Sequence, residues 1–313
     1  MHLPPFLTRL SDQPSQGLYV NCEFKHEDPL GKAHCLWWSA DLPTAIVLFI
    51  PGNPGLVDFY VPFLSHLHRT RKDLAILAHA HINHTPGFRS PRAKQILAVQ
   101  AKAATEVLDA LRKTYPALPV IIISHSVGAY ITLQVLKARE SEVRLALLIC
   151  PTISNIAHTP NGKRLSWLFR PPLPLLITAL SPIIRLLPGA FISTLFSEWP
   201  PAQMAVLSTF LNSPYSIFAA LSMAHDEMKN IQALDTELLR RHQHDIRIFF
   251  TSVDHWVGEQ EDVIRQFFEE FEPGSVKITR GIDGIPHAFC INHGEEVATQ
   301  CAQWIATHDF SLH

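Results

Sequence analysis

The feature that most constrains the fold is a series of short, apolar, largely β-branched runs that alternate with stretches of helical periodicity. Most of these runs have strand length and are predominantly apolar, as strands are when helices cover both faces of their sheet. The runs lie at 45–51, 74–79, 119–124, 143–150, 246–252 and 275–280. Their alternation with helical stretches predicts an α/β fold, a mostly parallel central sheet flanked by helices with right-handed crossovers.

The segments between the runs fit this fold, with one interruption. In the first long stretch, apolar residues recur three or four positions apart and therefore share one helix face. The predicted helices are 95–114, 127–139 and 293–308. Residues 18–38 predict two antiparallel leader strands. Because no comparable strand occurs across 151–244, we predict an inserted helical cap there, within a single domain that spans 1–313.

Composition excludes several classes of protein. Apolar residues make up 47% and charged residues 17%, against about 25% charged in an average soluble chain, which excludes disorder. A net charge of −2 gives no basic surface for nucleic acid. Five scattered cysteines without a Cys-x-x-Cys pair indicate a reducing compartment. Residues 1–17 hold no apolar run of signal-peptide length, so we expect no signal peptide and a location on the cytosolic side.

The strongest local motif is Ser124-His125-Ser126-Val127-Gly128, between a buried-strand run and a predicted helix. A nucleophile elbow, G-x-S-x-G, occurs in this context, where a tight strand-to-helix turn lifts the serine hydroxyl clear of the sheet. The turn needs small residues on both sides of the serine, and Ser124 is a small substitute for the first glycine. A chance match in a loop would lack the strand and the helix. The motif therefore predicts that Ser126 is a nucleophile.

A serine nucleophile of this kind needs amide donors for an oxyanion. The segment 51–55 (Pro-Gly-Asn-Pro-Gly) follows the first strand run, where such enzymes have a glycine-rich oxyanion loop. Pro54 has no N–H, so we predict that the backbone amides of Asn53 and Val127 form the oxyanion hole. Without the elbow, an ordinary proline–glycine turn would explain the same residues.

The other two members of a catalytic triad are expected later in the chain, in the order acid and then histidine, each just after a strand. Asp254 follows the strand-like run 246–252, and His287 follows 275–280. A turn-capping aspartate and a structural loop histidine are the alternatives, since the chain has 18 histidines. Order and position at strand ends favour Asp254 as the acid and His287 as the base.

Taken together, these motifs resemble the lipid droplet-associated hydrolase family of the α/β-hydrolase superfamily. The resemblance rests on segment 51–55 with Phe59-Tyr60, on 124–130, on Cys150-Pro151-Thr152-Ile153, and on Ile285-Pro286-His287-Ala288-Phe289. It covers most of the chain from about Ile46 to His293, and segment 51–55 is its most specific part.

The resemblance implies an α/β-hydrolase fold and a serine ester hydrolase with Ser126 as nucleophile, Asp254 as acid and His287 as base. The substrates that it implies are lipid esters, either sterol esters or acylglycerols. It also implies a location at the lipid droplet surface, with the endoplasmic reticulum membrane as a further location. The implied role is in lipid storage and turnover. The family usually has glycine where Ser124 stands. The mechanism needs no metal or organic cofactor. The sequence does not indicate an oligomeric state.

Two alternatives to a serine hydrolase remain open. His79, His81 and His84 resemble the H-x-H-x-D-H metal-ligand run of binuclear metallohydrolases. Asn83 replaces the aspartate of that run and is a much poorer ligand. The other alternative is a lipid-storage protein of the droplet surface whose hydrolase site is weak or vestigial.

Residues 171–201 form the most apolar segment and predict contact with a lipid surface. From Leu173 to Phe196 the only charged residue is Arg185, but Pro174, Pro182 and Pro188 interrupt the run. A spanning helix needs about 20 apolar residues, so two shorter arms predict a re-entrant or interfacial segment. Its flanks carry basic and aromatic residues suited to headgroup level: Lys163, Arg164, Trp167, Arg170 and Trp199. A buried pair of cap helices is the alternative.

Overall fold

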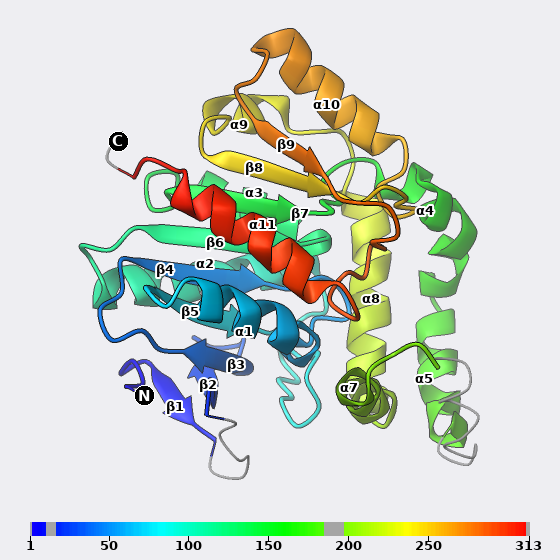
Figure 1. The fold of residues 1–313 in the computed structure, drawn as a ribbon. Helices are drawn as coiled ribbons and strands as arrows, with labels where there is room; N and C mark the ends of the chain where they lie inside the picture. The colour runs from blue at the N-terminus through cyan, green and yellow to red at the C-terminus, as the bar shows by residue number, and fades with distance from the viewer. Residues whose placement is uncertain (1, 11–16, 185–196, 311–313) are drawn as a thin grey trace.

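A single nine-stranded sheet, in the order β1-β2-β3-β5-β4-β6-β7-β8-β9, organises the chain in the computed structural model (Figure 1). The model describes residues 2–10, 17–184 and 197–310. The strands are β1 (Leu7–Arg9), β2 (Val20–Lys25), β3 (Lys32–Trp38), β4 (Ala45–Ile50), β5 (Leu74–His79), β6 (Val120–His125), β7 (Leu145–Ile149), β8 (Ile246–Phe250) and β9 (Lys277–Arg280). The pairs from β5 to β9 are parallel, and β1, β2 and β3 add to one edge in antiparallel pairing.

The predicted strands and leader pair are confirmed. All residues of β4, β5, β6, β7 and β8 are buried, because helices cover both faces of the sheet. The last strand, β9, lies at the edge and is only partly buried. The sequence analysis did not predict the short strand β1, which adds to the edge of the leader pair.

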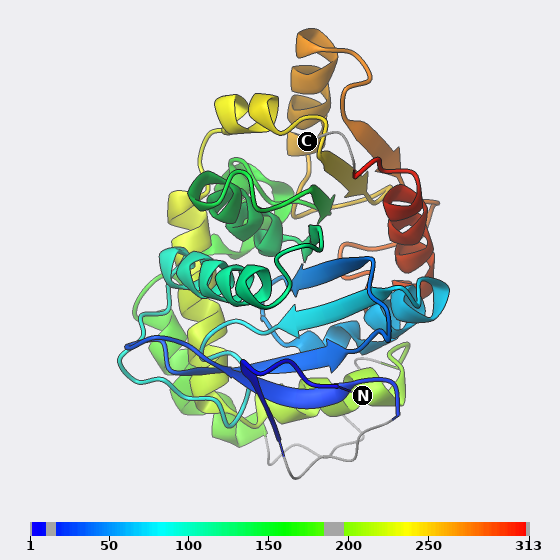
Figure 2. The same ribbon diagram turned by 90° about the vertical axis from the view of Figure 1, so that its left-hand side faces the viewer.

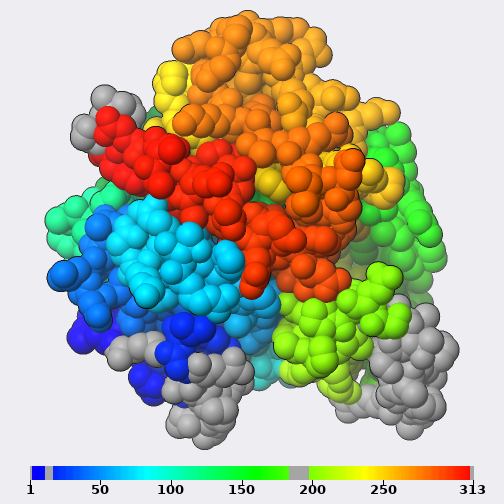
Figure 3. All heavy atoms as spheres, viewed as in Figure 1, coloured from blue at the N-terminus to red at the C-terminus, as the bar shows by residue number. Residues whose placement is uncertain are grey.

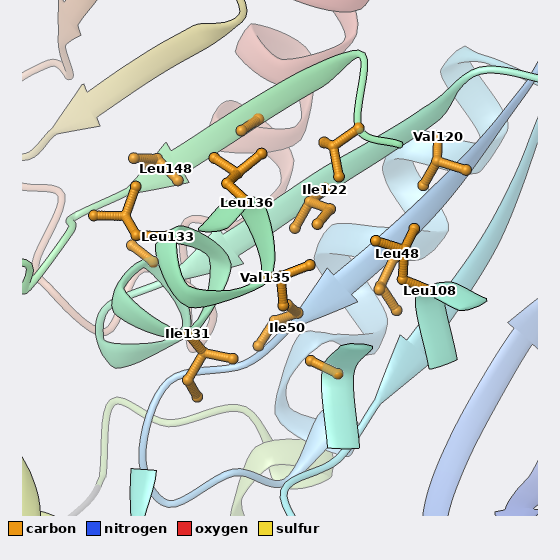
Figure 4. Packing of buried hydrophobic residues seen from close by; sticks show 14 of the residues in the cluster. Leu48, Ile50, Leu108, Val120, Ile122, Ile131, Leu133, Val135, Leu136 and Leu148 are labelled. Atoms are coloured by element: carbon orange, nitrogen blue, oxygen red, sulfur yellow. The ribbon is translucent and has the colours of Figure 1, made fainter. Parts of the chain in front are cut away.

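One face of the sheet packs against four helices. They are α2 (Leu97–Thr114), α3 (Val127–Ala138), α9 (Thr236–Arg241) and α10 (Gln260–Phe271). Figure 4 shows Leu48 and Ile50 from β4 and Ile122 from β6 packed against α3 residues such as Val135. In α2 and α3, predicted from periodicity, the apolar stripe faces this core.

The opposite face packs against α1 (Val61–Thr70) and α11 (Gly294–Ala306). These two helices contact one another and cover much of this face in the space-filling view (Figure 3). Seen from the side in Figure 2, α11 in red and α3 in green lie on opposite sides of the sheet. Helix α11 was predicted, whereas α1 and α10 were not.

Between β7 and β8, the described residues form helices rather than strands. These elements are η2 (Ile156–His158), α4 (Pro160–Leu165), η3 (Ser166–Phe169), α5 (Leu173–Ile184), α7 (Pro201–Leu211) and α8 (Pro214–Asn230), followed by α9. Prolines begin α4, α7 and α8, where the missing N–H costs no helical hydrogen bond. In Figure 1, α8 crosses the end of the sheet to which the strand arrows point.

The cap predicted at 151–244 is smaller than expected. Leu238 and Leu239 of α9 belong to the same buried cluster as β7 and β8. Helix α9 therefore packs on the sheet, and the cap proper ends with α8. We use "cap" below for residues 151–230.

The apolar segment 171–201 is described only in part. Its first arm is α5, which contains Pro182, while residues 185–196, with Arg185 and Pro188, lie outside the described residues. Leu175, Leu176 and Leu180 of α5 are 60%, 51% and 59% exposed. Among the described helices, no single one is long and apolar enough to cross a membrane. Helices α7 and α8 reach that length and apolar character only when taken together, and they are bent by 91° relative to one another.

Candidate active site

Ser126 lies in a sharp turn between β6, which ends at His125, and α3, which begins at Val127. Its backbone φ of 54° lies in a region that residues other than glycine seldom adopt. The Ser126 N–H donates to the Ile149 carbonyl at 2.9 Å. A Cβ on Gly128 would lie 2.5 Å from the Ile50 carbonyl oxygen, so only glycine fits there. This is the geometry of a nucleophile elbow.

Three loops bring the predicted triad together. His287, in the segment after β9, has its Nε2 3.0 Å from the Oγ of Ser126. The Nδ1 of the same ring lies 2.6 Å from Oδ2 of Asp254, in the segment after β8. With Nδ1–H donating to Asp254, Nε2 is the unprotonated nitrogen and accepts from the serine hydroxyl.

Backbone amides fix the Asp254 carboxylate in place. Trp256 and Val257 donate their N–H groups to Oδ1 at 2.8 and 3.0 Å. Burial alone would raise the pKa of Asp254, but the charge and hydrogen bond of His287 and these two amides outweigh it and hold the pKa below its ordinary value. Asp254 is therefore ionised at neutral pH, as the partner of an imidazolium must be.

The predicted oxyanion loop, residues 51–55, packs directly against Ser126. A Cβ on Gly52 would lie 3.0 Å from the Ser126 Cβ, so a larger residue would push the loop away. Asn53 lies beside Ser126 in the wall of the same cavity, and Val127 is the first residue of α3. Both residues are therefore placed near the nucleophile, and the role of their amides in binding an oxyanion stays a prediction.

A buried hydrogen-bond chain joins this loop to the segment that carries His287. The Gly52 N–H donates to the Tyr60 hydroxyl oxygen at 3.1 Å, and that hydroxyl lies 2.7 Å from Nδ1 of His125. Nε2 of His125 lies 2.9 Å from the His287 carbonyl oxygen and donates to it. Burial and the charge of His287 lower the pKa of His125 to about 3, so its ring is neutral. Sequence reasoning missed Tyr60 and His125, because the partners meet only in the fold.

A cavity of about 350 Å³ opens over Ser126 and His287. Its wall is largely apolar and comes mostly from the cap: Ile156, Phe169, Phe210, Ile217, Leu221 and Met228. The exception is Glu227 on α8, a carboxyl that is only 5% exposed. No local pattern indicated that Glu227 would be buried, since a glutamate near the end of a helix is usually solvated.

Three large apolar residues of the cap take different positions. Phe210 lines the catalytic cavity. Phe218 lines a second cavity of about 580 Å³, which shares Phe169 with the first. Met223 is fully buried and packs against Val127 and Ile156, so it belongs to the core.

The histidines of the metal-like run are not gathered into a metal-binding group. His79 pairs with His26, with 2.9 Å between their Nε2 atoms, and His84 lies 2.7 Å from the Pro54 carbonyl oxygen. Among the described residues, only one group of three or more histidine, cysteine, aspartate or glutamate side chains has its ligand atoms within 4.8 Å of one another. It consists of His125, Cys150 and His287. Hydrogen bonds to Tyr60 and to the triad already engage both histidines of that group.

The parallel sheet, the elbow and the hydrogen-bonded serine, histidine and aspartate define this protein as an α/β-hydrolase. Solved structures agree on the fold. An epoxide hydrolase from Vigna radiata superposes with a TM-score of 0.66 at 12% identity, covering 94% of this chain and 100% of its own. A carboxyl esterase from Bacillus coagulans gives a TM-score of 0.59 at 15% identity, covering 92% and 98%.

The family follows from the sequence comparisons. The family model for lipid-droplet associated hydrolase matches residues 43–290. A mouse protein named lipid droplet-associated hydrolase is 29% identical over 300 residues, which cover 84% of this chain and 85% of the mouse protein. The chain therefore belongs to the lipid droplet-associated hydrolase family, as its motifs predicted.

Proposed function

We propose that this protein is a serine hydrolase that cleaves carboxylic esters of lipids, such as acylglycerols or sterol esters. The observation that carries the proposal is the hydrogen-bonded order Ser126–His287–Asp254, with distances of 3.0 and 2.6 Å. Water-soluble esters would not need the apolar wall of the cavity above Ser126.

The proposed reaction is acyl transfer in two steps. His287 Nε2 takes the proton of the Ser126 hydroxyl as Oγ attacks the ester carbonyl, and Asp254 stabilises the imidazolium that forms. The amides of Asn53 and Val127 bind the oxyanion of the tetrahedral intermediate. His287 then gives its proton to the leaving alcohol, and a water molecule, activated by the same base, releases the acid and regenerates the serine.

We infer further that the cap contacts a lipid surface, either the droplet monolayer or the cytosolic face of the endoplasmic reticulum membrane. Helix α5 presents three exposed leucines to solvent, next to the 56%-exposed Trp167. Lys163, Arg164 and Arg170 are exposed on the same flank, at the basic border that an interfacial segment has. Trp199, on the other flank, packs edge-on against Phe59 at 6.3 Å and is only partly exposed. The names of the relatives support the droplet as the surface.

Active-site labelling tests the proposed chemistry. A fluorophosphonate probe should label the wild-type protein and leave Ser126→Ala unlabelled, because the probe reacts with a serine that an adjacent base activates. Hydrolysis of emulsified lipid esters should disappear in the same variant. Unlabelled wild-type protein without ester turnover would instead favour a droplet-surface protein with a vestigial site.

A further inference from the structure

Glu227 is a buried carboxyl in the wall of the catalytic cavity that the two-step mechanism does not use. It lies on α8 of the cap, among apolar side chains such as Ile217, Leu221 and Met228. Burying a carboxylate in such surroundings is costly unless it is paired with a positive charge. In the described part of the chain, the carboxyl of Glu227 makes no salt bridge and one hydrogen bond.

That one hydrogen bond occupies a single oxygen. Nδ2 of Asn53 donates to Oε1 of Glu227 at 2.9 Å and also to the Ala220 carbonyl oxygen at 3.0 Å. Oε2 has no hydrogen-bond partner among the described residues. Since Glu227 lines the cavity, this second oxygen is the one available to a ligand.

Glu227 is uncharged at neutral pH. Burial raises the pKa of Glu227 to about 8, Asn53 lowers it by hydrogen bonding, and the negative charge of Asp226 raises it further. Because Oε1 accepts from Asn53, the acidic proton is on Oε2. The cavity therefore holds one O–H donor in an apolar wall, in the same space as Ser126.

We propose that Glu227 is a specificity-determining residue whose Oε2–H binds a hydroxyl group on the alcohol part of the substrate. This inference rests on the proposed ester hydrolysis and narrows it to esters of polyols that keep a free hydroxyl, such as partial glycerol esters. A hydroxyl suits this position because it can accept from Oε2–H and donate in return. An ester of a purely hydrocarbon alcohol offers no partner.

The physical reason for selectivity is the cost of an unpaired donor. A bound hydrocarbon would displace water from Glu227 and leave its O–H without a partner, which costs free energy in a dry cavity. Sites built to hydrogen-bond a substrate hydroxyl reject analogues that lack it. We expect a preference of roughly 10- to 100-fold in kcat/KM, which corresponds to one such hydrogen bond.

Two esters of the same acid test the proposal, 1-decanoylglycerol and propyl decanoate, presented at equal mole fraction in detergent micelles. The wild-type protein should prefer the glycerol ester. Glu227→Met, which has similar volume but neither donor nor oxygen acceptor, should lose the preference. Glu227→Gln should keep it, because its amide can accept from Asn53 and donate into the cavity. Leu221→Met, a neighbouring apolar change in the same wall, serves as the matched control for the ratio.

The pH dependence of this ratio gives a second readout. As Glu227 loses its proton near pH 8, its carboxylate can accept from the substrate hydroxyl in place of donating to it. The preference should therefore persist on both sides of pH 8 in the wild-type protein and in Glu227→Gln, and should be absent in Glu227→Met at every pH. Asp226 on α8 adds a negative charge near Glu227, and His287 lies in the wall of the same cavity. His287 acts on both esters, so its contribution cancels in the ratio.

Different outcomes would refute the role of Glu227 and the proposed ester hydrolysis. Equal kcat/KM values for the two esters in the wild-type protein, or equal losses on both in Glu227→Met, would overturn the role in specificity. Glu227 would then only hold Asn53 in place. If the wild-type protein hydrolyses neither ester and the fluorophosphonate probe does not label Ser126, the proposed hydrolysis fails and this inference fails with it.

Discussion

The body of the molecule and its cap distribute polar and apolar groups in opposite ways. In the body, strands such as β4 and β7 are wholly apolar and buried along their length, and most charged residues lie on the surface. In the cap, Leu175, Leu176 and Leu180 are more than half exposed, while the carboxyl of Glu227 is 5% exposed.

The contrast distinguishes residues that stabilise the fold from residues whose placement the stability of the fold does not explain. Burial of apolar side chains stabilises the body by about 25 cal/mol per Å², and nothing in that term favours leucines in water or a carboxyl in a dry cavity. Neither feature adds to stability, so we propose that each serves a ligand on its own side of the cap. The proposed outer ligand is a lipid surface, and the proposed inner ligand is an ester substrate.

The largest expected effect belongs to the body. His287→Ala should reduce ester turnover about 10⁴-fold or more, since a triad acts as one unit. Asp254→Asn should cost less than the loss of the serine, because the misoriented imidazole keeps some basicity. Steady-state kinetics on a short-chain ester measure both, with the exposed Ser141→Ala as control. Rates close to wild type in His287→Ala would refute the assigned base.

Removing the exposed leucines tests the outer side of the cap. Leu176→Ser with Leu180→Ser should lower binding to phospholipid-coated triacylglycerol emulsions on the order of 100-fold, at about 0.8 kcal/mol for each methylene no longer buried. Thermal unfolding should change little, because both side chains face solvent. Flotation measures binding, and Leu42→Ser in the β3–β4 loop, 86% exposed, is the matched control.

Unchanged flotation of that double variant would exclude α5 as a contact with lipid. A large fall in the unfolding temperature would show instead that α5 is packed as part of the core, which would remove the contrast with the body.

Breaking the buried hydrogen-bond chain that runs from Gly52 to His287 should have a moderate effect on catalysis. Tyr60→Phe removes the hydroxyl that accepts from Gly52 and donates to His125. We expect roughly a tenfold loss in kcat with little change in KM, the size of one buried hydrogen bond, because the oxyanion loop and His287 lose their common support. Tyr19→Phe, another buried tyrosine, is the control. An unchanged kcat would mean that the chain serves stability alone.

The last expected effect is on stability rather than on activity, and it depends on pH. With the pKa of Glu227 raised to about 8 against about 4.3 in an unfolded chain, the native state holds a proton that the unfolded state releases. The free energy of unfolding of the wild-type protein should therefore fall as pH rises from about 4.3 to 8 and then level off.

Glu227→Gln should remove this loss. Its unfolding temperature should exceed that of the wild type at pH 8 by about 2–4 °C for each kcal/mol recovered, and by little at pH 5. Differential scanning fluorimetry measures both, with the exposed Glu269→Gln as control. A difference between the proteins that does not depend on pH would contradict a protonated Glu227.

Local sequence patterns predicted the body and most of the catalytic motif. Strand length, apolar runs and the small residues around Ser126 are local signals, and each is set by backbone geometry that a few neighbouring residues decide. Asp254 and His287, which were predicted at strand ends, lie within hydrogen-bonding reach of one another and of Ser126, since parallel strands end at one edge of a sheet. The short edge strand β1, the helices α1 and α10 and the boundary of the cap were missed, because pattern alone gave them no distinct signal.

Which cap residues line the cavity over Ser126 depends on the tertiary fold. Asn53 and Glu227 are 174 positions apart, and Tyr60 and His125 are 65 apart, so no local pattern relates them. Residue type alone does not indicate whether a glutamate is solvated or enclosed in a cavity. The charge and the partners of Glu227 depend on residues that the fold packs around it, so the sequence predicted the nucleophile elbow but not the role of Glu227.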